Sequence, residues 1–328
     1  MILILEKNTT HPQAQQLIER LENMGLKAVK EEKGGRIAIA IVSGIDAGTQ
    51  EQHFSRLPHV EKVEQFSQQF KLAGKDLRDK KLIIDVKGKT IGGGELCVMA
   101  GPCSIENEEQ IHRIAKSVKQ SGAQFLRGGA FKPRTSPYDF QGLGEEGVRY
   151  LQEAARENDM VSVSEVMDLD QLEIALGKVD VFQVGARNMQ NYTLLKELGK
   201  TQTPVMLKRG FAATYREFLN AAEYILNAGN PNVILCERGI RTFESYTRNT
   251  LDIGAVPALR ELTHLPIIID PSHGTGIRSM VAPMAYAGVA AGADGIMVEV
   301  HYDPDRSYSD AQQAISCEAF AEMMPKLE

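Results

Sequence analysis

The sequence predicts an α/β protein in which a (β/α)₈ TIM barrel follows a small α+β domain. From residue 96 onward, a short apolar segment followed by an amphipathic helical segment recurs eight times. The short segments are rich in Val, Ile and Leu on both faces, as a parallel sheet covered on both sides requires. Eight such units in about 230 residues is the usual size of the barrel. A doubly wound open sheet is the structural alternative, but no glycine-rich dinucleotide loop follows the first strand of the repeat.

The sequence pattern over residues 1–70 predicts a separate small domain with the element order βαββαβ. Apolar runs predict its strands, and apolar residues at helical spacing predict its helices. This order is typical of the ferredoxin-like topology. No catalytic pattern stands in this part, so we expect an interaction or regulatory domain. The expected elements are strands at 2–5, 27–30, 37–42 and 60–66, with helices at 12–24 and 49–57.

Residues 71–94 are charged and contain glycine, and they predict a linker followed by a hairpin that caps the barrel. The barrel itself is expected over residues 95–328. Its strands are expected at 96–100, 124–127, 161–165, 181–184, 204–208, 233–237, 266–270 and 295–300. Its helices are expected near 108–121, 145–158, 168–177, 191–199, 214–228, 250–262, 278–291 and 310–324.

The composition excludes several classes of function. The net charge is −6, whereas non-specific nucleic-acid binding needs a surplus of basic residues on one face. Four scattered cysteines are too few for a disulfide framework in a chain of 328 residues. The start of the chain lacks the cationic segment of a signal peptide, and no apolar run approaches the ~18 residues that a membrane span needs. These features predict a cytoplasmic protein with no nucleic-acid or membrane partner.

Cationic side chains gather where the predicted barrel strands end. Active sites of TIM barrels lie at the carboxyl ends of the strands, so we expect these cations to face one mouth. Like charges this close together are unfavourable unless anions neutralise them, and Arg and Lys suit phosphate and carboxylate. The sequence therefore predicts a site for more than one anionic group. The residues are Arg127, Lys132, Arg134, Arg187, Lys208, Arg209 and Arg238.

A second set of strand-end residues has the chemistry of metal ligands. Cys103 follows the first barrel strand, His273 follows the seventh, Glu299 lies at the end of the eighth, and Asp310 lies in the loop beyond. The first and eighth strands become neighbours when the barrel closes. Mixed sulfur, nitrogen and oxygen ligands suit one divalent ion such as Mn, Fe, Co or Zn. Each residue alone has a simpler explanation, since a free Cys is usually a small buried hydrophobe.

The motifs at these strand ends resemble those of the 3-deoxy-D-arabino-heptulosonate 7-phosphate (DAHP) synthase family. The resemblance covers essentially the whole barrel. The appended domain is similar to that of the short type I members that carry a ferredoxin-like domain. The matching motifs are AGPCSIE at 100–106, LRGGAFKPRTSPYDFQGLG at 126–144, QVGARNMQN at 183–191, LKRGF at 207–211, LCERGIRTFE at 235–244, DPSHGTG at 270–276 and VEVH at 298–301.

The resemblance implies a transferase that condenses phosphoenolpyruvate with erythrose 4-phosphate at the entry to the shikimate pathway. It also implies one divalent metal per subunit that orients or polarises the aldehyde. Motif matches assign phosphoenolpyruvate to Arg127, Lys132, Gly185, Ala186, Arg187, Lys208 and Arg238. They assign erythrose 4-phosphate to Arg134, Thr135 and Asp310, and the metal to Cys103, His273, Glu299 and Asp310. Lys132 and Glu165 are candidates for handling the proton of the water, and Cys103 and His273 complete the predicted catalytic set.

Two other functions compete with this one. The related 3-deoxy-D-manno-octulosonate 8-phosphate synthases use arabinose 5-phosphate on the same barrel and typically read Lys-Ala-Asn-Arg-Ser, where residues 132–136 here read Lys-Pro-Arg-Thr-Ser. A non-catalytic barrel that only senses ligands is the third possibility, and two complete ligand sets disfavour it. One departure from the family pattern is Ala311, which replaces the usual glycine after Asp310 and could alter the backbone of that loop.

The family resemblance extends to regulation and assembly. Ferredoxin-like domains of this kind can pair and trap a ligand between them. We therefore expect an aromatic amino acid effector, Tyr or Phe, at residues 1–70. Barrels of this family form tetramers, which predicts a homotetramer.

Overall fold

The computed structural model describes residues 1–44, 51–133, 136 and 138–327. The chain divides into two compact units, which are described separately. The first comprises Met1–Lys81 with Leu262–His264. The second comprises Leu82–Glu261 with Leu265–Glu328.

The first unit contains an antiparallel sheet with the strand order β2-β3-β1-β4 in its described residues. Helix α1 begins after Thr10, which forms a capping box with Gln13 and so satisfies amide groups at the start of the helix. Its apolar side chains pack with one face of the sheet, including Leu3 and Ile39. The element order is the predicted βαββαβ. The elements are β1 (Ile2–Leu5), α1 (His11–Asn23), β2 (Lys27–Lys33), β3 (Arg36–Ser43), α2 (Glu51–Ser55) and β4 (Val60–Glu64).

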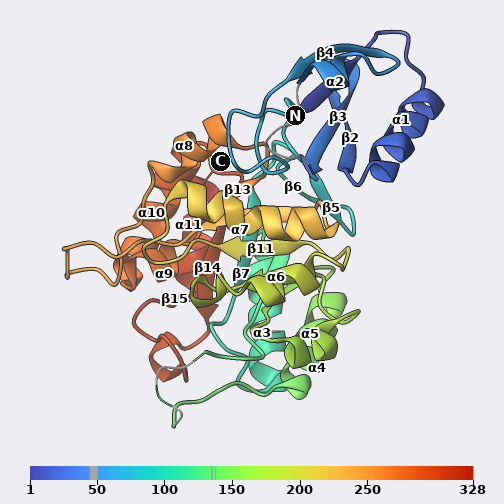
Figure 1. Ribbon diagram of the computed structural model, residues 1–328. Helices are drawn as coiled ribbons and strands as arrows, with labels where there is room; N and C mark the ends of the chain where they lie inside the picture. The colour runs from blue at the N-terminus through green and yellow to red at the C-terminus, as the bar shows by residue number, and fades with distance from the viewer. Residues whose placement is uncertain (45–50, 134–135, 137, 328) are drawn as a thin grey trace. The chain divides into compact units, whose positions relative to one another are not determined.

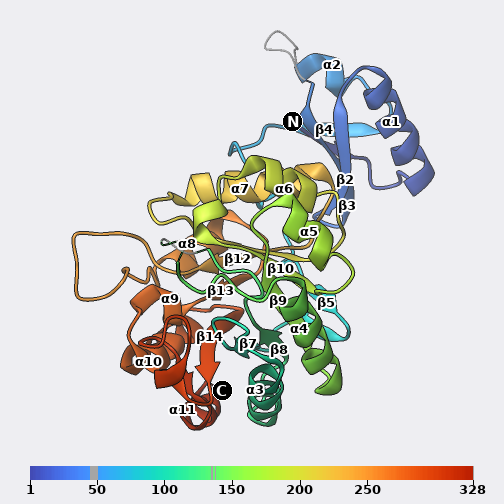
Figure 2. The same cartoon turned by 90° about the horizontal axis from the view of Figure 1, so that it is seen from below.

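The second unit is a closed parallel barrel, which confirms the predicted fold class. Its strands β7 to β14 pair in chain order, and pairing of β14 with both β7 and β13 closes the ring in the described chain. The helices lie outside the strands (Figures 1 and 2). The strands are β7 (Cys97–Gly101), β8 (Phe125–Arg127), β9 (Val161–Glu165), β10 (Val181–Val184), β11 (Val205–Lys208), β12 (Val233–Glu237), β13 (Ile267–Ile269) and β14 (Gly295–His301).

The helices of the barrel agree with the predicted ones except in its last third. Helix α8 begins at Ala255 rather than near 250, and Thr250 instead pairs with Ile240 in an antiparallel bridge. A short helix that was not predicted, α9, covers Pro271–Thr275. The last helix was predicted from 310, but a turn and the short strand β15 (Ile315–Ser316) precede it. The longer helices are α3 (Glu108–Gln120), α4 (Glu145–Glu157), α5 (Leu169–Ala175), α6 (Tyr192–Leu198), α7 (Tyr215–Ala228), α8 (Ala255–Leu262), α10 (Arg278–Ala290) and α11 (Cys317–Met323).

A hairpin fills the amino end of the barrel. Strands β5 (Ile84–Val86) and β6 (Lys89–Ile91) pair antiparallel. Their buried side chains belong to the same apolar cluster as Cys97, Val161 and Val181, the first residues of β7, β9 and β10. The hairpin is also tied to the start of β10 by an ion pair of 2.7 Å between Lys87 Nζ and Asp180 Oδ1. The carboxyl ends of the strands therefore form the open mouth.

Candidate active site

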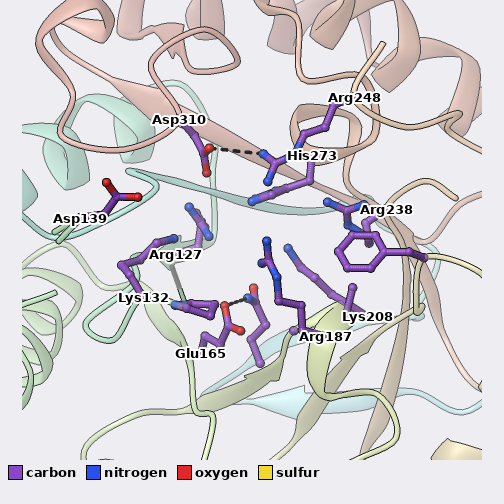
Figure 3. Close-up of a pocket in the computed structure, with 15 residues that line it drawn as sticks. Arg127, Lys132, Asp139, Glu165, Arg187, Lys208, Arg238, Arg248, His273 and Asp310 are labelled. Atoms are coloured by element: carbon purple, nitrogen blue, oxygen red, sulfur yellow. Dashed lines mark hydrogen bonds and ion pairs between the residues drawn. The ribbon is translucent and has the colours of Figure 1, made fainter. Parts of the chain in front are cut away.

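The cavity at the carboxyl ends of the strands collects side chains from β8 to β11 and from the segments that follow β8 and β10 to β14. Figure 3 shows these side chains converging on one central space. Of the six predicted cations that lie in the described residues, five line it. The lining residues are Arg127, Lys132, Pro133, Asp139, Glu165, Gln183, Gly185, Ala186, Arg187, Lys208, Phe211, Arg238, Arg248, His273 and Asp310.

Arg127 and Arg238 line the cavity, and each has one buried nitrogen without a hydrogen-bond partner in the described residues. Both residues are buried, yet Arg127 Nε and Arg238 Nη1 have no hydrogen-bond partner among the described residues. Burial is the main reason that the pKa of Arg238 lies below its ordinary value. Buried donors without a partner are rare because they forfeit their hydration, so these two point to an anionic ligand. The Phe211 ring, with its centroid 4.8 Å from the Arg238 guanidinium carbon, holds that group from one side.

Lys208 and His273 share one buried carboxylate, Asp270. Lys208 Nζ donates to Asp270 Oδ2 at 2.6 Å, and His273 Nδ1 lies 2.8 Å from the same oxygen. Burial opposes ionisation of Asp270, but the charges of His273 and Lys208 outweigh it and hold its pKa well below the ordinary value. The other ring nitrogen, His273 Nε2, lies 3.3 Å from Glu299 Oε1. Asp270 was not among the predicted site residues, although it directly follows a strand and precedes His273.

The prediction that Arg209 faces the mouth is wrong. Its Nη1 donates to Glu237 Oε2 at 2.9 Å and to Asp252 Oδ2 at 2.8 Å, and its Nε donates to the backbone oxygen of Ala213. Consecutive residues of an extended chain point to opposite sides, so Arg209 faces away from the side on which Lys208 lies. It holds the loop after β11 against β12 instead of lining the cavity.

The predicted metal ligands lie together. One donor atom from each of Cys103, Glu299 and Asp310 lies within 4.8 Å of the others. Cys103 Sγ is 3.2 Å from Asp310 Oδ2, and His273 reaches the set through Glu299. A thiol, an imidazole and two carboxylates form a donor set suited to a divalent transition ion. Asp270 orients His273 as carboxylates commonly orient metal-bound histidines, so these residues fit the metal that the sequence predicts.

Electrostatics in the site favour charged carboxylates and a neutral thiol. Burial, helped by Glu299 and Asp310, raises the pKa of the Cys103 thiol to about 12. Burial also opposes ionisation of Asp310, but His273 and Arg248 lower its pKa to about 2. Glu299 behaves similarly, since His273 and Arg127 outweigh burial and lower its pKa. A cation bound beside Cys103 would favour its thiolate, which is the form that ligates metals.

Lys132 and Glu165 lie across the cavity from Arg248 (Figure 3). Lys132 Nζ lies 3.1 Å from Cys103 Sγ and donates to the Cys103 backbone oxygen at 3.0 Å. Burial alone would lower the pKa of Lys132, but Cys103 and the site carboxylates raise it. Glu165 Oε2 accepts a hydrogen bond of 2.9 Å from Gln183 Nε2, and Gln183 was not predicted as a site residue.

Gly185 brings the backbone close to Glu165. A Cβ atom at position 185, between β10 and the next turn, would lie 2.1 Å from Glu165 Oε1, so a larger residue would displace that carboxylate. The backbone there can approach a ligand closely. Gly185, Ala186 and Arg187 all line the cavity, as their place after β10 predicts.

The loop after β14 presents Asp310 with a left-handed backbone, φ 51°. Asp tolerates this conformation better than most residues. Ala311 is not among the described residues with positive φ, so the alanine at this position requires no left-handed backbone. Arg278 holds the loop by donating hydrogen bonds to the backbone oxygens of Gln312 and Ala311, at 2.9 and 2.8 Å.

Two of the three residues assigned to the sugar phosphate, Arg134 and Thr135, lie outside the described residues. The cavity is also lined by Arg248, Phe211 and Asp139. These residues were not predicted, because they lie in loops beyond the strand ends. In the described part of the chain, no helix combines the length and apolarity that crossing a membrane demands.

Comparison with known families matches nearly the whole length of the chain. The model of the DAHP synthetase I family matches residues 78–328. The model of the DAHP synthase ferredoxin-like domain matches residues 1–68.

Individual relatives agree with these matches. Phospho-2-dehydro-3-deoxyheptonate aldolase of Thermotoga maritima is 43% identical over 328 residues, covering 100% of this chain and 97% of the relative. The crystal structure of the Thermotoga maritima enzyme aligns with a TM-score of 0.78 over 99% of this chain and 95% of its own, at 43% identity. A 2-dehydro-3-deoxyphosphooctonate aldolase of Syntrophobacter fumaroxidans is more distant, at 32% identity over 74% of this chain and 90% of the relative.

Proposed function

The chain belongs to the DAHP synthetase I family, and from that premise we propose how its cavity condenses phosphoenolpyruvate with erythrose 4-phosphate to DAHP and phosphate. The unsatisfied donors of Arg127 and Arg238 are the observation that supports this proposal most directly. They lie in a cavity with three further predicted cations, Lys132, Arg187 and Lys208. Two phosphorylated substrates, one of them also a carboxylate, supply the anions that such a set requires.

Phosphoenolpyruvate would occupy the cationic part of the cavity. Arg127, Arg187, Lys208 and Arg238 would bind its phosphate and carboxylate, with backbone groups of Gly185 and Ala186 beside them. Lys132 would extend these contacts toward Cys103, which its Nζ already approaches. Together they would hold the enol carbon in one orientation, and fixing reactants in this way removes much of the entropy cost of a bimolecular step.

Erythrose 4-phosphate would bind beside it, with its phosphate on Arg134 and Thr135 and its aldehyde end toward Asp310. Cys103, His273, Glu299 and Asp310 would hold the divalent metal. When bound, the metal supplies Lewis acidity that polarises the aldehyde carbonyl. Mn, Fe, Co and Zn all suit this donor set, and metal analysis of the purified protein would identify the native ion.

The bond changes follow from the chemistry of the two substrates. C3 of phosphoenolpyruvate attacks the aldehyde carbon, forming the new C–C bond, and the aldehyde oxygen takes up a proton. Water adds to C2, which has lost electron density, and gives up a proton there. The bond between C2 and the phosphate oxygen then breaks while the new C2 hydroxyl loses its proton, leaving the ketone of the product and inorganic phosphate, which takes up that proton. We assign the transfer of the water's proton to Glu165 and Lys132, which both line the cavity.

An assay of phosphate release with two aldoses tests this function. We expect release from phosphoenolpyruvate to depend on erythrose 4-phosphate and to stop when a chelator removes the metal. Equal or faster turnover with arabinose 5-phosphate would refute the substrate and favour the octulosonate chemistry of the more distant relatives.

Substitution of Arg134 separates the two anion sites. Arg134→Ala should raise the KM for erythrose 4-phosphate by about 100-fold, since hydrogen bonds to charged groups contribute ~1.5–3 kcal/mol each. The KM for phosphoenolpyruvate should change much less. The opposite pattern would contradict the division of the cavity between the two substrates.

The N-terminal unit supports a regulatory proposal, because its ferredoxin-like sheet is separate from the strands that build the barrel. We propose that this unit binds Tyr or Phe and that the chain works as a cytoplasmic homotetramer. Inhibition assays with both amino acids, before and after deletion of residues 1–70, test the effector, and sedimentation of the full chain tests the assembly. Unchanged sensitivity after deletion would dispose of the regulatory role.

A further inference from the structure

We infer that Arg248 and Gln313 are positioning residues that hold two of the proposed metal ligands, Asp310 and Glu299, in their ligating orientation. The inference rests on the metal site of the proposed function. Neither residue directly follows a barrel strand, and neither belongs to the predicted ligand or substrate sets.

One guanidinium nitrogen and one amide link the two carboxylates. Arg248 Nη1 donates to Asp310 Oδ1 at 3.3 Å and to Gln313 Oε1 at 3.0 Å. Gln313 Nε2 donates to Glu299 Oε2 at 2.7 Å. Because the amide oxygen accepts from Arg248, the amide nitrogen must face Glu299, so the two bonds fix the orientation of the amide. Figure 3 shows the contact between Arg248 and Asp310.

In each carboxylate the two oxygens therefore have different partners. Asp310 Oδ1 faces Arg248, while Oδ2 lies 3.2 Å from Cys103 Sγ. Glu299 Oε2 faces Gln313, while Oε1 lies 3.3 Å from His273 Nε2. Asp310 Oδ2 and Glu299 Oε1 therefore lie beside the donor atoms of the other proposed metal ligands. Hydrogen bonds of this kind orient ligands and determine which oxygen a metal meets.

The backbone around Arg248 is anchored to the helix that carries His273. Arg248 N donates to Thr275 O at 2.8 Å, and Asn249 Nδ2 donates to His273 O at 3.1 Å. Gly276 permits this approach, since a Cβ atom there would lie 2.6 Å from Arg248 Cβ. Arg248 therefore connects α9 to the loop that holds Asp310.

Gln313 is fully buried, so its amide has no access to water as an alternative hydrogen-bond partner. A buried amide that satisfies both an arginine and a carboxylate keeps its orientation, since any rotation would leave polar groups unpaired. Gln313 therefore holds Glu299 Oε2 from a buried position, while Arg248 reaches the amide from an exposed loop.

Metal binding to the stripped full-length protein tests the inference. The variants are Arg248→Met, Gln313→Met and the double variant. The matched control is Arg149→Met, which removes an exposed arginine that pairs with Glu153 on α4. Mn²⁺ affinity is measured by competition with a chelating dye, and the visible absorption of bound Co²⁺ reports the coordination geometry.

We expect each single variant to bind Mn²⁺ about 10-fold more weakly and to change the Co²⁺ spectrum, since loss of residues that orient ligands typically costs about 10–100-fold in affinity. The double variant should be little worse than either single one, because both changes break the same connection. Arg149→Met should match the wild type in both measurements. At saturating Mn²⁺ Gln313→Met, whose residue is not among those that line the cavity, should regain most of its turnover.

Other outcomes would overturn the inference. If Arg248 acted only through its charge, Arg248→Met would bind Mn²⁺ more tightly and Gln313→Met would be unchanged. If both residues served only stability, the melting temperature would fall while the affinity stayed at the wild-type value. Wild-type protein that bound neither Mn²⁺ nor Co²⁺ would instead refute the metal site of the proposed function, which distinguishes that failure from the first two.

Discussion

Asp270 offers the sharpest test of how the cavity is built, because one buried carboxylate orients both a lysine that lines the cavity and a proposed metal ligand. It accepts hydrogen bonds from Lys208 Nζ at 2.6 Å and from His273 N at 2.9 Å, and it lies 2.8 Å from His273 Nδ1. Asp270→Asn keeps the size of the side chain but removes its charge. Whichever way the new amide faces, one of its positions presents N–H groups to a donor.

The expected cost follows from these bonds. Hydrogen bonds to charged groups contribute ~1.5–3 kcal/mol each, and Asp270→Asn removes the charge from both side-chain bonds and reverses one amide position, so the free energy of unfolding should fall by up to about 6 kcal/mol. Removal of one partner from a buried ion pair, at ~3–5 kcal/mol, gives a similar range. Because Asp270 also orients His273, Mn²⁺ affinity should fall by about 10–100-fold.

Urea denaturation of the metal-free protein and Mn²⁺ titration measure the two effects. The matched control is Asp180→Asn at the amino end of the barrel, where Asp180 accepts from Ser162 N and Oγ and pairs with Lys87. The control should lose some stability but keep the Mn²⁺ affinity and both KM values. Asp270→Asn with wild-type stability, or with unchanged Mn²⁺ affinity, would refute this account of the site.

Two further predictions concern other parts of the cavity. Gly185→Ala should lower kcat/KM for phosphoenolpyruvate by at least about 10-fold, because the added Cβ would lie 2.1 Å from Glu165 Oε1 and must displace that side chain; steady-state kinetics that match the wild type would contradict the close approach. The pKa of Asp310 is about 2 in the folded protein against an ordinary value of 3.8. The ionised carboxylate therefore stabilises the folded protein at pH values above 3.8, and this stabilisation is lost as the pH falls from 3.8 toward 2. The shift corresponds to about 2 kcal/mol, and the difference in urea midpoint between metal-free wild type and Asp310→Asn should shrink over that interval; a constant difference would show that the shift is absent.

Much of the barrel could be predicted because its signals are local. Alternating short apolar runs and amphipathic helices identify β7 to β14 without tertiary information. The cations at strand ends could be selected for the same reason, since the fold brings those ends together. Arg209 marks where that selection was too coarse: it directly follows Lys208, so alternation along an extended chain places it on the opposite side, where Glu237 and Asp252 bind it.

The residues that were missed act through partners far away in the sequence. Arg248 meets Asp310 from 62 positions away, and Gln183 meets Glu165 from 18. Asp270 stood in a recognised motif, but its bond to Lys208 spans 62 positions. Such pairings depend on register and loop conformation, which no local pattern encodes. Helix α11 was placed too early because its approach through Asp310 has a left-handed backbone that propensities do not reveal.

Because the hairpin of β5 and β6 closes the amino end of the barrel, molecules can enter and leave only at the carboxyl end. Its side chains Ile84, Val86 and Ile91 occupy the amino end and pack with the first residues of the strands. Both substrates and both products must therefore use the same doorway at the carboxyl end. A molecule seated deep in the cavity cannot leave while another covers it, so the order of arrival constrains the order of departure. Substitutions that weaken the packing of the hairpin should lower the stability of the barrel before they open a second exit.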